Sequence, residues 1–301
     1  MIFVFGSINI DLVARVERIA APGETVLGPS YCVIAGGKGA NQALAARRAG
    51  ASVAMVGAVG IDGFAQPALA QLIEDGVDIS RVSRVDAPTG AAFIAVDAQG
   101  QNAITVASGA NGHARAAQLA EHTLQPSDWL LLQRETPDKE GEAAARIAKA
   151  RGARVMLNLA PAGAIHDSYL ALIDILVVNE HEADLLGQSR GLVEPTLAQV
   201  SEATAKAGCA AMIVTLGAAG AQGWSAGQHF NLPAFKVAVV DTTAAGDAFV
   251  GAFAAALAQG EEFRKAMRFG LAAGSLACTK TGAQPSLPHA NDIASLLASQ
   301  N

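Results

Sequence analysis

The sequence predicts an α/β protein with a mostly parallel β-sheet and a second, smaller β unit. Short, continuous apolar runs alternate with stretches that favour helices, which is typical of parallel strands covered on both faces. Two further stretches break this alternation with β-favouring residues and turns. Hydrophobic residues make up 51% of the 301 residues, so a large core can form and general disorder is excluded.

The predicted strands are the apolar runs, and the predicted helices are the Ala-, Leu- and charge-containing segments between them. In chain order the strands are Ile2–Phe5, Val53–Val59, Trp129–Leu132, Val155–Leu159, Ile175–Val178 and Met212–Leu216. The helices are Gly39–Ala49, Gln66–Asp75, Glu140–Ala150 and Ala198–Ala207. Gly50 comes just after Arg47 and Arg48, which is a stop signal for the first helix.

The smaller β unit is predicted from two stretches, Glu24–Ala35 and Thr89–Ser108. Residues 97–100 read Asp-Ala-Gln-Gly between β-favouring residues, which indicates a hairpin turn. Periodicity leaves open whether these stretches form an inserted unit or edge strands of the main sheet, and we interpret them as an inserted unit. No linker composition separates them from the rest. We therefore expect one domain over residues 1–301, with inserted segments at about 11–36 and 88–110.

Composition excludes several classes of protein. The net charge is −6 without a basic stripe, which argues against nucleic-acid binding. No apolar run approaches the ~18 residues of a membrane-spanning helix. The N-terminus lacks the basic region of a signal peptide, so we expect a cytoplasmic protein. Cys32, Cys209 and Cys278 form no C-x-x-C pair, and we expect small buried hydrophobic residues rather than disulfides or a zinc site.

One motif lies near the C-terminus, where Asp241-Thr-Thr-Ala-Ala-Gly-Asp247 follows the apolar run Val237–Val240. We interpret the run as a strand and expect a helix to follow the loop as far as about Gln259. Small residues at a helix start let backbone N–H groups approach an anion. Asp247 beside such an anion would suit a general base. The alternative is an ordinary helix start with an aspartate stabilised by the helix dipole, which spacing alone favours.

A second motif, Gly36-Gly-Lys-Gly-Ala-Asn41, joins the β unit to the first helix. Its glycines allow close backbone approach, while Lys38 and Asn41 offer polar groups to a hydroxyl-rich ligand. The alternative is a tight turn with a solvated lysine. The standard Walker A, dinucleotide-binding and G-x-S-x-G motifs are absent from the sequence.

Together the two motifs resemble the two signatures of the ribokinase-like (PfkB-type) carbohydrate kinases. The resemblance runs nearly end to end, through the matching segments Gly6–Asp11, Leu132–Glu135, Asn158–Ala162, Asn179–Glu182, Thr215–Gly220 and Gly282–Ser286. The chain departs from the family pattern at Leu159, at Ala218 and Ala219, and at Arg134, where many members have an apolar residue. Arg134 is the departure that bears on substrate choice, because it could pair with Glu135 or meet an anionic substrate.

The resemblance implies a three-layer α/β/α core with a mostly parallel sheet, covered by a small β-sheet lid. It also implies ATP-dependent phosphorylation of a sugar hydroxyl, with D-ribose to D-ribose 5-phosphate as the nearest match. Two alternatives stay open. One is a kinase of the same family for another sugar, a sugar acid or a nucleoside. The other is a catalytically silent sugar-binding regulator on the same fold.

The family also implies roles for individual residues. Asp247 would be the base, and the backbone amides of Ala244, Ala245 and Gly246 would form an anion hole for the transferred phosphoryl group. Residues expected to hold the sugar are Asn9, Asp11, Gly37, Lys38, Gly39, Asn41, Glu135 and Asp247. Residues expected at the nucleotide are Asn179, Thr215, Leu216, Gly217, Gly220 and Gly246.

Cofactors and partners follow from the same resemblance. Glu182 would hold Mg²⁺ through its water shell. A K⁺ site would be formed by side-chain or carbonyl oxygens of Asp241, Thr243, Ala277, Lys280, Gly282 and Ser286. The expected partners are ATP, a small sugar and a second copy of the chain, in a homodimer built through the lid. Neither nucleic acid nor a membrane is expected.

Overall fold

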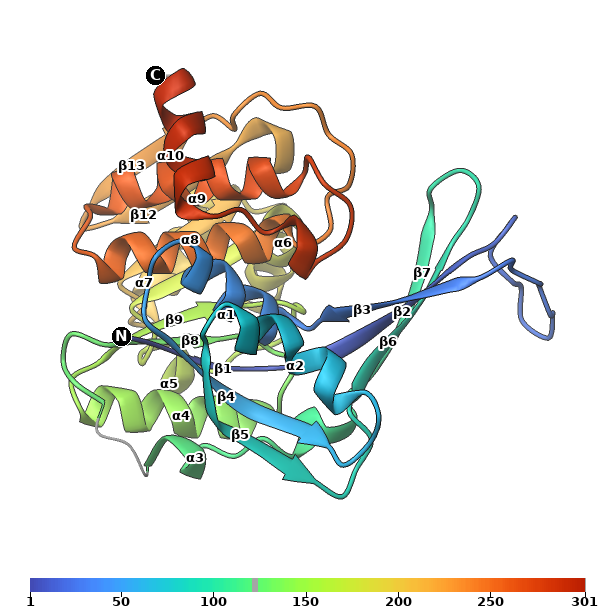
Figure 1. The fold of residues 1–301 in the computed structure, drawn as a ribbon. Coiled ribbons are helices and arrows are strands. Elements are labelled where there is room, and N and C mark those ends of the chain that lie inside the picture. Colours follow the sequence, from blue (N-terminus) through green and yellow to red (C-terminus); the bar gives the residue numbers. More distant parts are fainter. Residues whose placement is uncertain (121–123, 301) are drawn as a thin grey trace.

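The computed structural model describes residues 1–120 and 124–300, and its larger sheet has nine strands (Figure 1). They are β1 (Ile2–Phe5), β4 (Val53–Gly60), β5 (Asp78–Val85), β8 (Trp129–Leu132), β9 (Arg154–Asn158), β10 (Ile175–Asn179), β11 (Ala211–Thr215), β12 (Ala221–Ser225) and β13 (Gln228–Leu232). Their order is β13-β12-β11-β10-β9-β8-β1-β4-β5. The strands from β11 to β5 are parallel, and β12 and β13 are antiparallel at one edge.

Helices cover both faces of this sheet. One face carries α1 (Lys38–Arg48), α2 (Ala65–Glu74), α8 (Ala245–Ala258), α9 (Phe263–Ala277) and α10 (Ala290–Ser299). The other carries α3 (Ala117–Ala120), α4 (Asp138–Ala150), α5 (Asp167–Leu170), α6 (Glu180–Ser189) and α7 (Leu197–Lys206). Along β1, Ile2 and Val4 enter the first core, whereas Phe3 and Phe5 enter the second. A strand buried on both faces is therefore a continuous apolar run, and the expected three-layer architecture is confirmed.

A separate four-stranded sheet projects from the body of the molecule, and we call it the lid sheet (Figure 1). It consists of β2 (Asn9–Arg15), β3 (Tyr31–Gly36), β6 (Gly90–Val96) and β7 (Asn102–Ala107), in the order β3-β2-β6-β7. The hairpin turn between β6 and β7 is closed by the Gly100 amide, which donates to the Asp97 carbonyl at 3.0 Å. The two irregular stretches thus contribute β3, β6 and β7 to an inserted unit, rather than edge strands to the main sheet. The sequence analysis missed β2, which lies outside both stretches, and residues 24–30 form no strand.

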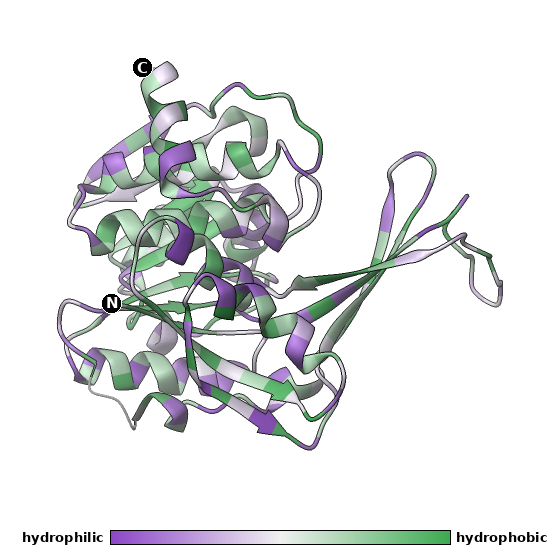
Figure 2. Ribbon diagram, in the orientation of Figure 1, coloured by the Kyte–Doolittle hydropathy of each residue, from purple (hydrophilic) through white to green (hydrophobic). Residues whose placement is uncertain are grey.

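Apolar residues occur along the lid sheet as well as in the main sheet (Figure 2), and several of those on the lid sheet are exposed. Tyr31 is 68% exposed, Phe93 51%, Ile104 53% and Val106 49%. Cys32 is also exposed here, and Cys278 is only half-buried, so the expectation that all three cysteines are buried holds for Cys209 alone. Cys32 lies on β3, and residues 31–33 of this strand are all exposed to solvent.

The structure also corrects the expected strand at Val237–Val240. No strand forms there, because the meander β11-β12-β13 already completes that edge of the sheet. Val239 and Val240 are exposed, and the Val240 amide donates to the Cys278 carbonyl at 2.8 Å. The apolar-run criterion also missed β5, β12 and β13, which lie toward the sheet edges and in which polar residues interrupt the apolar ones. Among the described residues, no helix is both long and apolar enough to span a membrane.

Candidate active site

The main sheet places polar residues at the carboxyl ends of its parallel strands. The order reverses at β1, which has β4 on one side and β8 on the other. Ligands of open α/β sheets bind outside the carboxyl ends of strands at such a switch point. Polar residues at or just beyond strand ends there are Asn9, Glu135, Asn158, Asn179 and Thr215.

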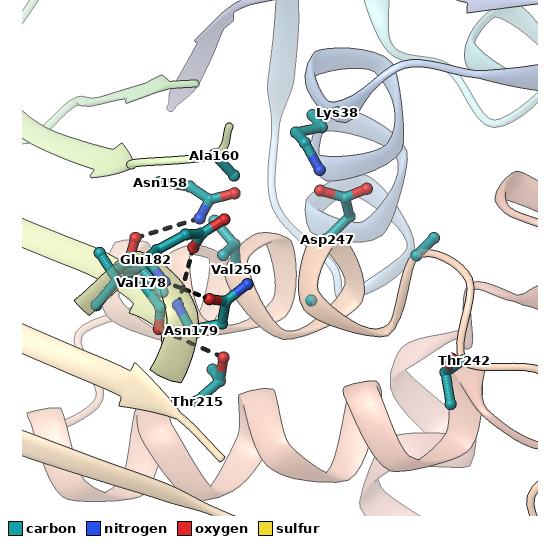
Figure 3. A pocket seen from close by; sticks show the side chains of 13 residues that line it. Lys38, Asn158, Ala160, Val178, Asn179, Glu182, Thr215, Thr242, Asp247 and Val250 are labelled. Atoms are coloured by element: carbon teal, nitrogen blue, oxygen red, sulfur yellow. Dashed lines mark hydrogen bonds between the residues drawn. The ribbon is translucent and has the colours of Figure 1, made fainter. Parts of the chain in front are cut away.

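Two neighbouring cavities occupy this edge. The first, about 240 Å³, is lined by residues that include Asn179, Glu182, Thr215, Gly246 and Asp247, and we call it the nucleotide-side cavity (Figure 3). The second, about 430 Å³, lies toward the lid sheet, and we call it the lid-side cavity. Its lining includes Asn9 and Glu135. Lys38 lines both cavities, and its side chain is directed toward Asp247 (Figure 3).

Glycines bring Lys38 to this position. Gly37 precedes α1 with a φ of 89°, and a Cβ there would lie 2.8 Å from the Asn9 nitrogen. A Cβ at Gly39 would lie 2.6 Å from the carbonyl carbon of Gly6. The start of α1 can therefore press against the chain between β1 and β2 only because both positions lack side chains. Gly39 thus serves packing, and it lines neither cavity.

Asp247 is buried in the first turn of α8, with its carboxylate directed toward α1. Its Oδ2 accepts a hydrogen bond from Asn41 Nδ2, and its Oδ1 accepts one from Gln42 Nε2, both at 2.9 Å. Burial raises the pKa of Asp247, while Lys38 and the two amide donors act in the opposite direction. This is not the solvent-exposed aspartate of an ordinary helix start.

Of the residues expected to hold a sugar, Asn9, Lys38 and Glu135 line the lid-side cavity. Asp247 lines the nucleotide-side cavity instead, and Asp11 and Asn41 line neither. Glu135 Oε2 accepts from Ser7 Oγ at 2.6 Å and from the Lys38 amide at 3.1 Å. Burial, followed by the charges of Glu135 and Asp247, raises the pKa of Asp11 to about 6. The Oδ1 of Asn41 is buried without a partner, which leaves an acceptor for a ligand hydroxyl.

Four buried polar residues of the site were missed by the sequence analysis. Ser7 bonds Glu135, and Gln42 bonds Asp247. Asn111 Nδ2 donates to Asn9 Oδ1 at 2.6 Å, and Gln133 Nε2 donates to Gln42 Oε1 at 2.7 Å. Three of them lie inside or beside the motifs, where a polar residue next to an apolar run was the available signal. Asn111, in the turn of residues 109–113, had no such signal.

On the nucleotide side, Asn179 and Glu182 form a capping box at the start of α6. The Asn179 amide donates to Glu182 Oε2, and the Glu182 amide donates to Asn179 Oδ1, each at 2.8 Å. Burial raises the pKa of Glu182, and Lys38 opposes that rise. Thr215 lines the nucleotide-side cavity, whereas Leu216, Gly217 and Gly220 lie in the turn beyond it and do not line it.

The start of α8 presents backbone to the same cavity. Ala244 has a left-handed backbone with φ of 60°, and α8 begins at Ala245. A Cβ at Gly246 would meet no protein atom within 4 Å, so the missing side chain leaves space at the helix start. The Ala245 amide donates to the Thr242 carbonyl at 3.2 Å. Of the three amides expected to form the anion hole, this one is therefore engaged within the turn.

Asp241 ties together the two loops expected to hold K⁺. Its Oδ1 accepts from the Thr243 amide at 2.9 Å and its Oδ2 from the Gly282 amide at 2.9 Å. Burial would raise the pKa of Asp241, but these bonds hold it below the ordinary value. Ser286 is buried and donates to the Ala283 carbonyl at 2.8 Å.

Arg134 does not pair with Glu135. Its Nε donates to Asp138 Oδ1 at 2.9 Å, and its Nη2 pairs with the other oxygen of Asp138. The side chain is only 13% exposed, and its Nη1 would lie 2.5 Å from a Cβ at Gly163. Asp138 in the first turn of α4 therefore engages Nε and Nη2, whereas Nη1 is buried without a partner and the residue also lines the lid-side cavity.

With this geometry in place, comparison with known proteins identifies the family. The model of the pfkB family of carbohydrate kinases matches residues 1–290. The chain therefore belongs to the PfkB family of carbohydrate kinases, enzymes that transfer a phosphoryl group to a sugar hydroxyl.

Within this family the chain is similar to ribokinases. The ribokinase of Haemophilus influenzae is 41% identical over 288 residues, which cover 95% of this chain and 94% of that protein. The crystal structure of the Thermotoga maritima ribokinase has a TM-score of 0.92 and 36% identity, with 99% of both chains covered. The Arabidopsis thaliana ribokinase complexed with ribose and ATP has a TM-score of 0.88 and 32% identity, with 98% of both chains covered.

Proposed function

We propose that this enzyme phosphorylates D-ribose with ATP, giving D-ribose 5-phosphate and ADP. The observation that carries the proposal is Asp247, a buried carboxylate that lines the nucleotide-side cavity beside Lys38, the residue common to both cavities. The similarity to ribokinases, one of them complexed with ribose and ATP, supports ribose as the sugar.

In the proposed reaction, Asp247 accepts the proton of the attacking sugar hydroxyl. The hydroxyl oxygen forms a bond to the γ-phosphorus of ATP as the bond to the ADP oxygen breaks, so ADP leaves with the electron pair. We assign the charge that develops on the transferred group to the amides of Ala244 and Gly246, of which Gly246 offers the more open approach. The Ala245 amide would join them only by leaving the Thr242 carbonyl. Base and helix start lie on one turn of α8, which suits in-line transfer.

The sugar hydroxyls are held by groups that accept or donate two hydrogen bonds each. We assign this role to Asn9, Asp11, Asn41 and Glu135, together with Lys38 and the backbone of Gly37. The unpartnered Oδ1 of Asn41 fits a hydroxyl donor. The lid sheet covers the sugar, because Asn9 and Asp11 lie on β2 itself. Exclusion of water by such a lid would prevent wasteful hydrolysis of ATP.

For the nucleotide we assign Asn179, Thr215 and the turn at residues 216–220. Among the described residues, no group of three His, Cys, Asp or Glu side chains could hold a metal alone. Mg²⁺ in kinases relies on phosphate oxygens and water beside one or two carboxylates, so Glu182 fits as the carboxylate that holds its water shell. When bound, Mg²⁺ neutralises charge on the phosphate oxygens.

The oxygen-rich loops around Asp241 fit a monovalent cation. A single carboxylate with several carbonyl groups suits K⁺, which prefers oxygen ligands of low total charge. We assign the site to Asp241 and Ser286 with the carbonyls of Thr243, Ala277, Lys280 and Gly282. By joining the loop before α8 to the loop at residues 280–286, the cation would fix the start of α8.

We further propose that residues 1–301 act as one domain and form a cytoplasmic homodimer through the lid sheet. Exposed apolar side chains support this assembly, because they mark an interaction surface. Tyr31 and Phe93 lie on one face of the lid sheet, and Ile104 and Val106 lie on the other.

Substitution of Asp247 tests the base. Asp247→Asn keeps the size of the side chain but cannot take the proton, and loss of a general base costs about 10²–10⁴ in rate. We expect turnover to fall by this factor while sugar binding, measured by calorimetry, is roughly retained. Turnover near that of the wild type would contradict the role.

A substrate panel tests ribose against other members of the family. We expect ribose to have the highest kcat/KM in a panel with deoxyribose, fructose, keto-deoxy sugar acids and nucleosides, measured by coupled ADP release. A different preferred sugar would redirect the proposal. Absence of ADP release with every sugar would favour a silent sugar-binding regulator.

A further inference from the structure

The site contains a fully buried glutamine, Gln42, whose side chain contacts Asp247 directly. We propose that Gln42, held in one orientation by Gln133, is a positioning residue that aims the Asp247 carboxylate at the sugar hydroxyl. The proposal rests on the role of Asp247 as the base.

The hydrogen bonds of these residues form a chain with one direction. Gln133 Nε2 donates to Gln42 Oε1 at 2.7 Å, and Gln42 Nε2 donates to Asp247 Oδ1 at 2.9 Å. Gln42 Nε2 also donates to Asn158 Oδ1 at 3.0 Å. An ionised carboxylate can only accept, so Gln42 must present its NH₂ group to Asp247 and its oxygen to Gln133. The bond from Gln133 Nε2 satisfies the Gln42 oxygen in this orientation. Asn158 Oδ1 favours the same orientation, because Asn158 Nδ2 is itself held by the Val177 carbonyl.

The surrounding backbone makes room for this chain. A Cβ at Gly6 would lie 2.0 Å from Gln133 Oε1, so the Gln133 amide occupies the space of a missing side chain. A Cβ at Gly251 on α8 would lie 2.6 Å from the Gln42 carbonyl oxygen on α1. The two helices therefore approach closely beside the site, and this lets side chains of α1 reach Asp247.

Orientation matters because Asp247 lies among several charges. Lys38 on α1 favours its ionised form, while Glu135, Asp11 on β2 and Glu182 on α6 oppose it. With burial also raising the pKa of Asp247, an amide N–H on Oδ1 stabilises the form that can accept a proton. A carbonyl oxygen in its place would favour the protonated form.

The test compares Gln42→Met with a matched control. Methionine keeps the length of the side chain and removes the donor. We expect kcat/KM for ribose to fall about 10- to 100-fold, the range for a hydrogen bond to a charged group. The acid limb of the pH profile of kcat/KM should move to higher pH, because loss of a donor raises the pKa of Asp247. The control is Gln118→Met. In the wild type, Gln118 lies away from both cavities, and its Nε2 donates to the carbonyls of Gly57 and Arg81. It should leave the acid limb in place.

A second variant keeps the proposal testable if Gln42→Met does not fold. Gln133→Leu removes the partner that orients Gln42 and should move the acid limb in the same direction by a smaller amount. An acid limb that does not move in Gln42→Met would overturn the proposal, even if the rate falls. If Gln42→Met does not fold, the same outcome in Gln133→Leu would overturn it. If Asp247→Asn is inactive and the limb is unmoved, only the positioning role fails. If Asp247→Asn stays active, the base itself fails.

Discussion

At the scale of single residues, the site concentrates carboxylates around one cation. Asp11, Glu135, Glu182 and Asp247 all act on the charge of Lys38 and raise its pKa, with Asp247 the largest contributor and burial acting in the opposite direction. The carboxylates also act on one another, and burial raises the pKa of Asp11, Glu182 and Asp247. The carboxylates that would bind a polyhydroxyl substrate thus lower the stability of the enzyme when no substrate is bound.

Asp11 makes this cost measurable. Its pKa is about 6 in the native state against an ordinary value of 3.8, so the native state binds the proton more tightly than the unfolded state. Ionised Asp11 therefore lowers stability at neutral pH, and the loss disappears as pH falls through about 6 towards 3.8. We expect Asp11→Asn to raise the free energy of unfolding by about 1–2 kcal/mol at pH 7.5. The gain should shrink at pH 5, measured by urea denaturation.

The same variant should bind ribose about 10- to 100-fold more weakly at pH 7.5, because a hydrogen-bonded charge is lost. The exposed Asp86→Asn is the control and should change neither quantity. A variant Asp11→Asn that is less stable than the wild type at pH 7.5 would contradict the electrostatic account.

Arg134 gives a second prediction for a single residue. Its Nε and Nη2 are engaged by the exposed Asp138, and a neutral sugar offers no negative charge for the guanidinium group to bind. Arg134→Leu should leave kcat/KM for ribose within a few-fold of the wild type, and Asp138→Asn should behave alike. A large loss confined to sugar acids would instead show that Arg134 meets an anionic substrate.

At the scale of elements, α8 depends on the loops before and beyond it. Asp241 bonds the amides of Thr243 and Gly282, which lie 39 residues apart in sequence, so one side chain sets the loop that leads into the helix. A cation held between these loops would act on the helix start at a distance from the sugar.

This arrangement predicts activation by K⁺. Turnover should be several-fold higher in K⁺ than in Na⁺ or a bulky organic cation at equal ionic strength. Asp241→Ala should abolish the difference while the circular dichroism spectrum stays unchanged. Identical rates in all three cations would leave Asp241 with the role of tying the loops together.

At the scale of the whole molecule, the lid sheet and its apolar surface imply assembly. We expect a dimer by light scattering, and Ile104→Lys on β7 should shift it toward monomer, because a buried charge is costly at an interface. Val193→Lys is the control, since Val193 is 89% exposed on the body and should not affect assembly. An active wild-type monomer, or a dimer unaffected by Ile104→Lys, would contradict assembly through the lid.

The sequence determined the layered core and most of its parallel strands, because a strand buried on both faces must be apolar throughout. It also determined where the two motifs lie, since a helix start that receives an anion needs small residues. It could not show β12 and β13, whose half-exposed residues carry no continuous apolar pattern, and it misread Val237–Val240 as a strand.

Only the tertiary structure decided which residues meet. Gln42 and Asp247 are 205 residues apart in sequence, and their hydrogen bond exists because α1 and α8 approach at Gly251. Arg134 pairs with Asp138 rather than its neighbour Glu135, because the first turn of α4 brings Asp138 beside it. Local patterns encode secondary structure and burial, whereas the partner of a buried polar group depends on elements that the chain brings together from a distance.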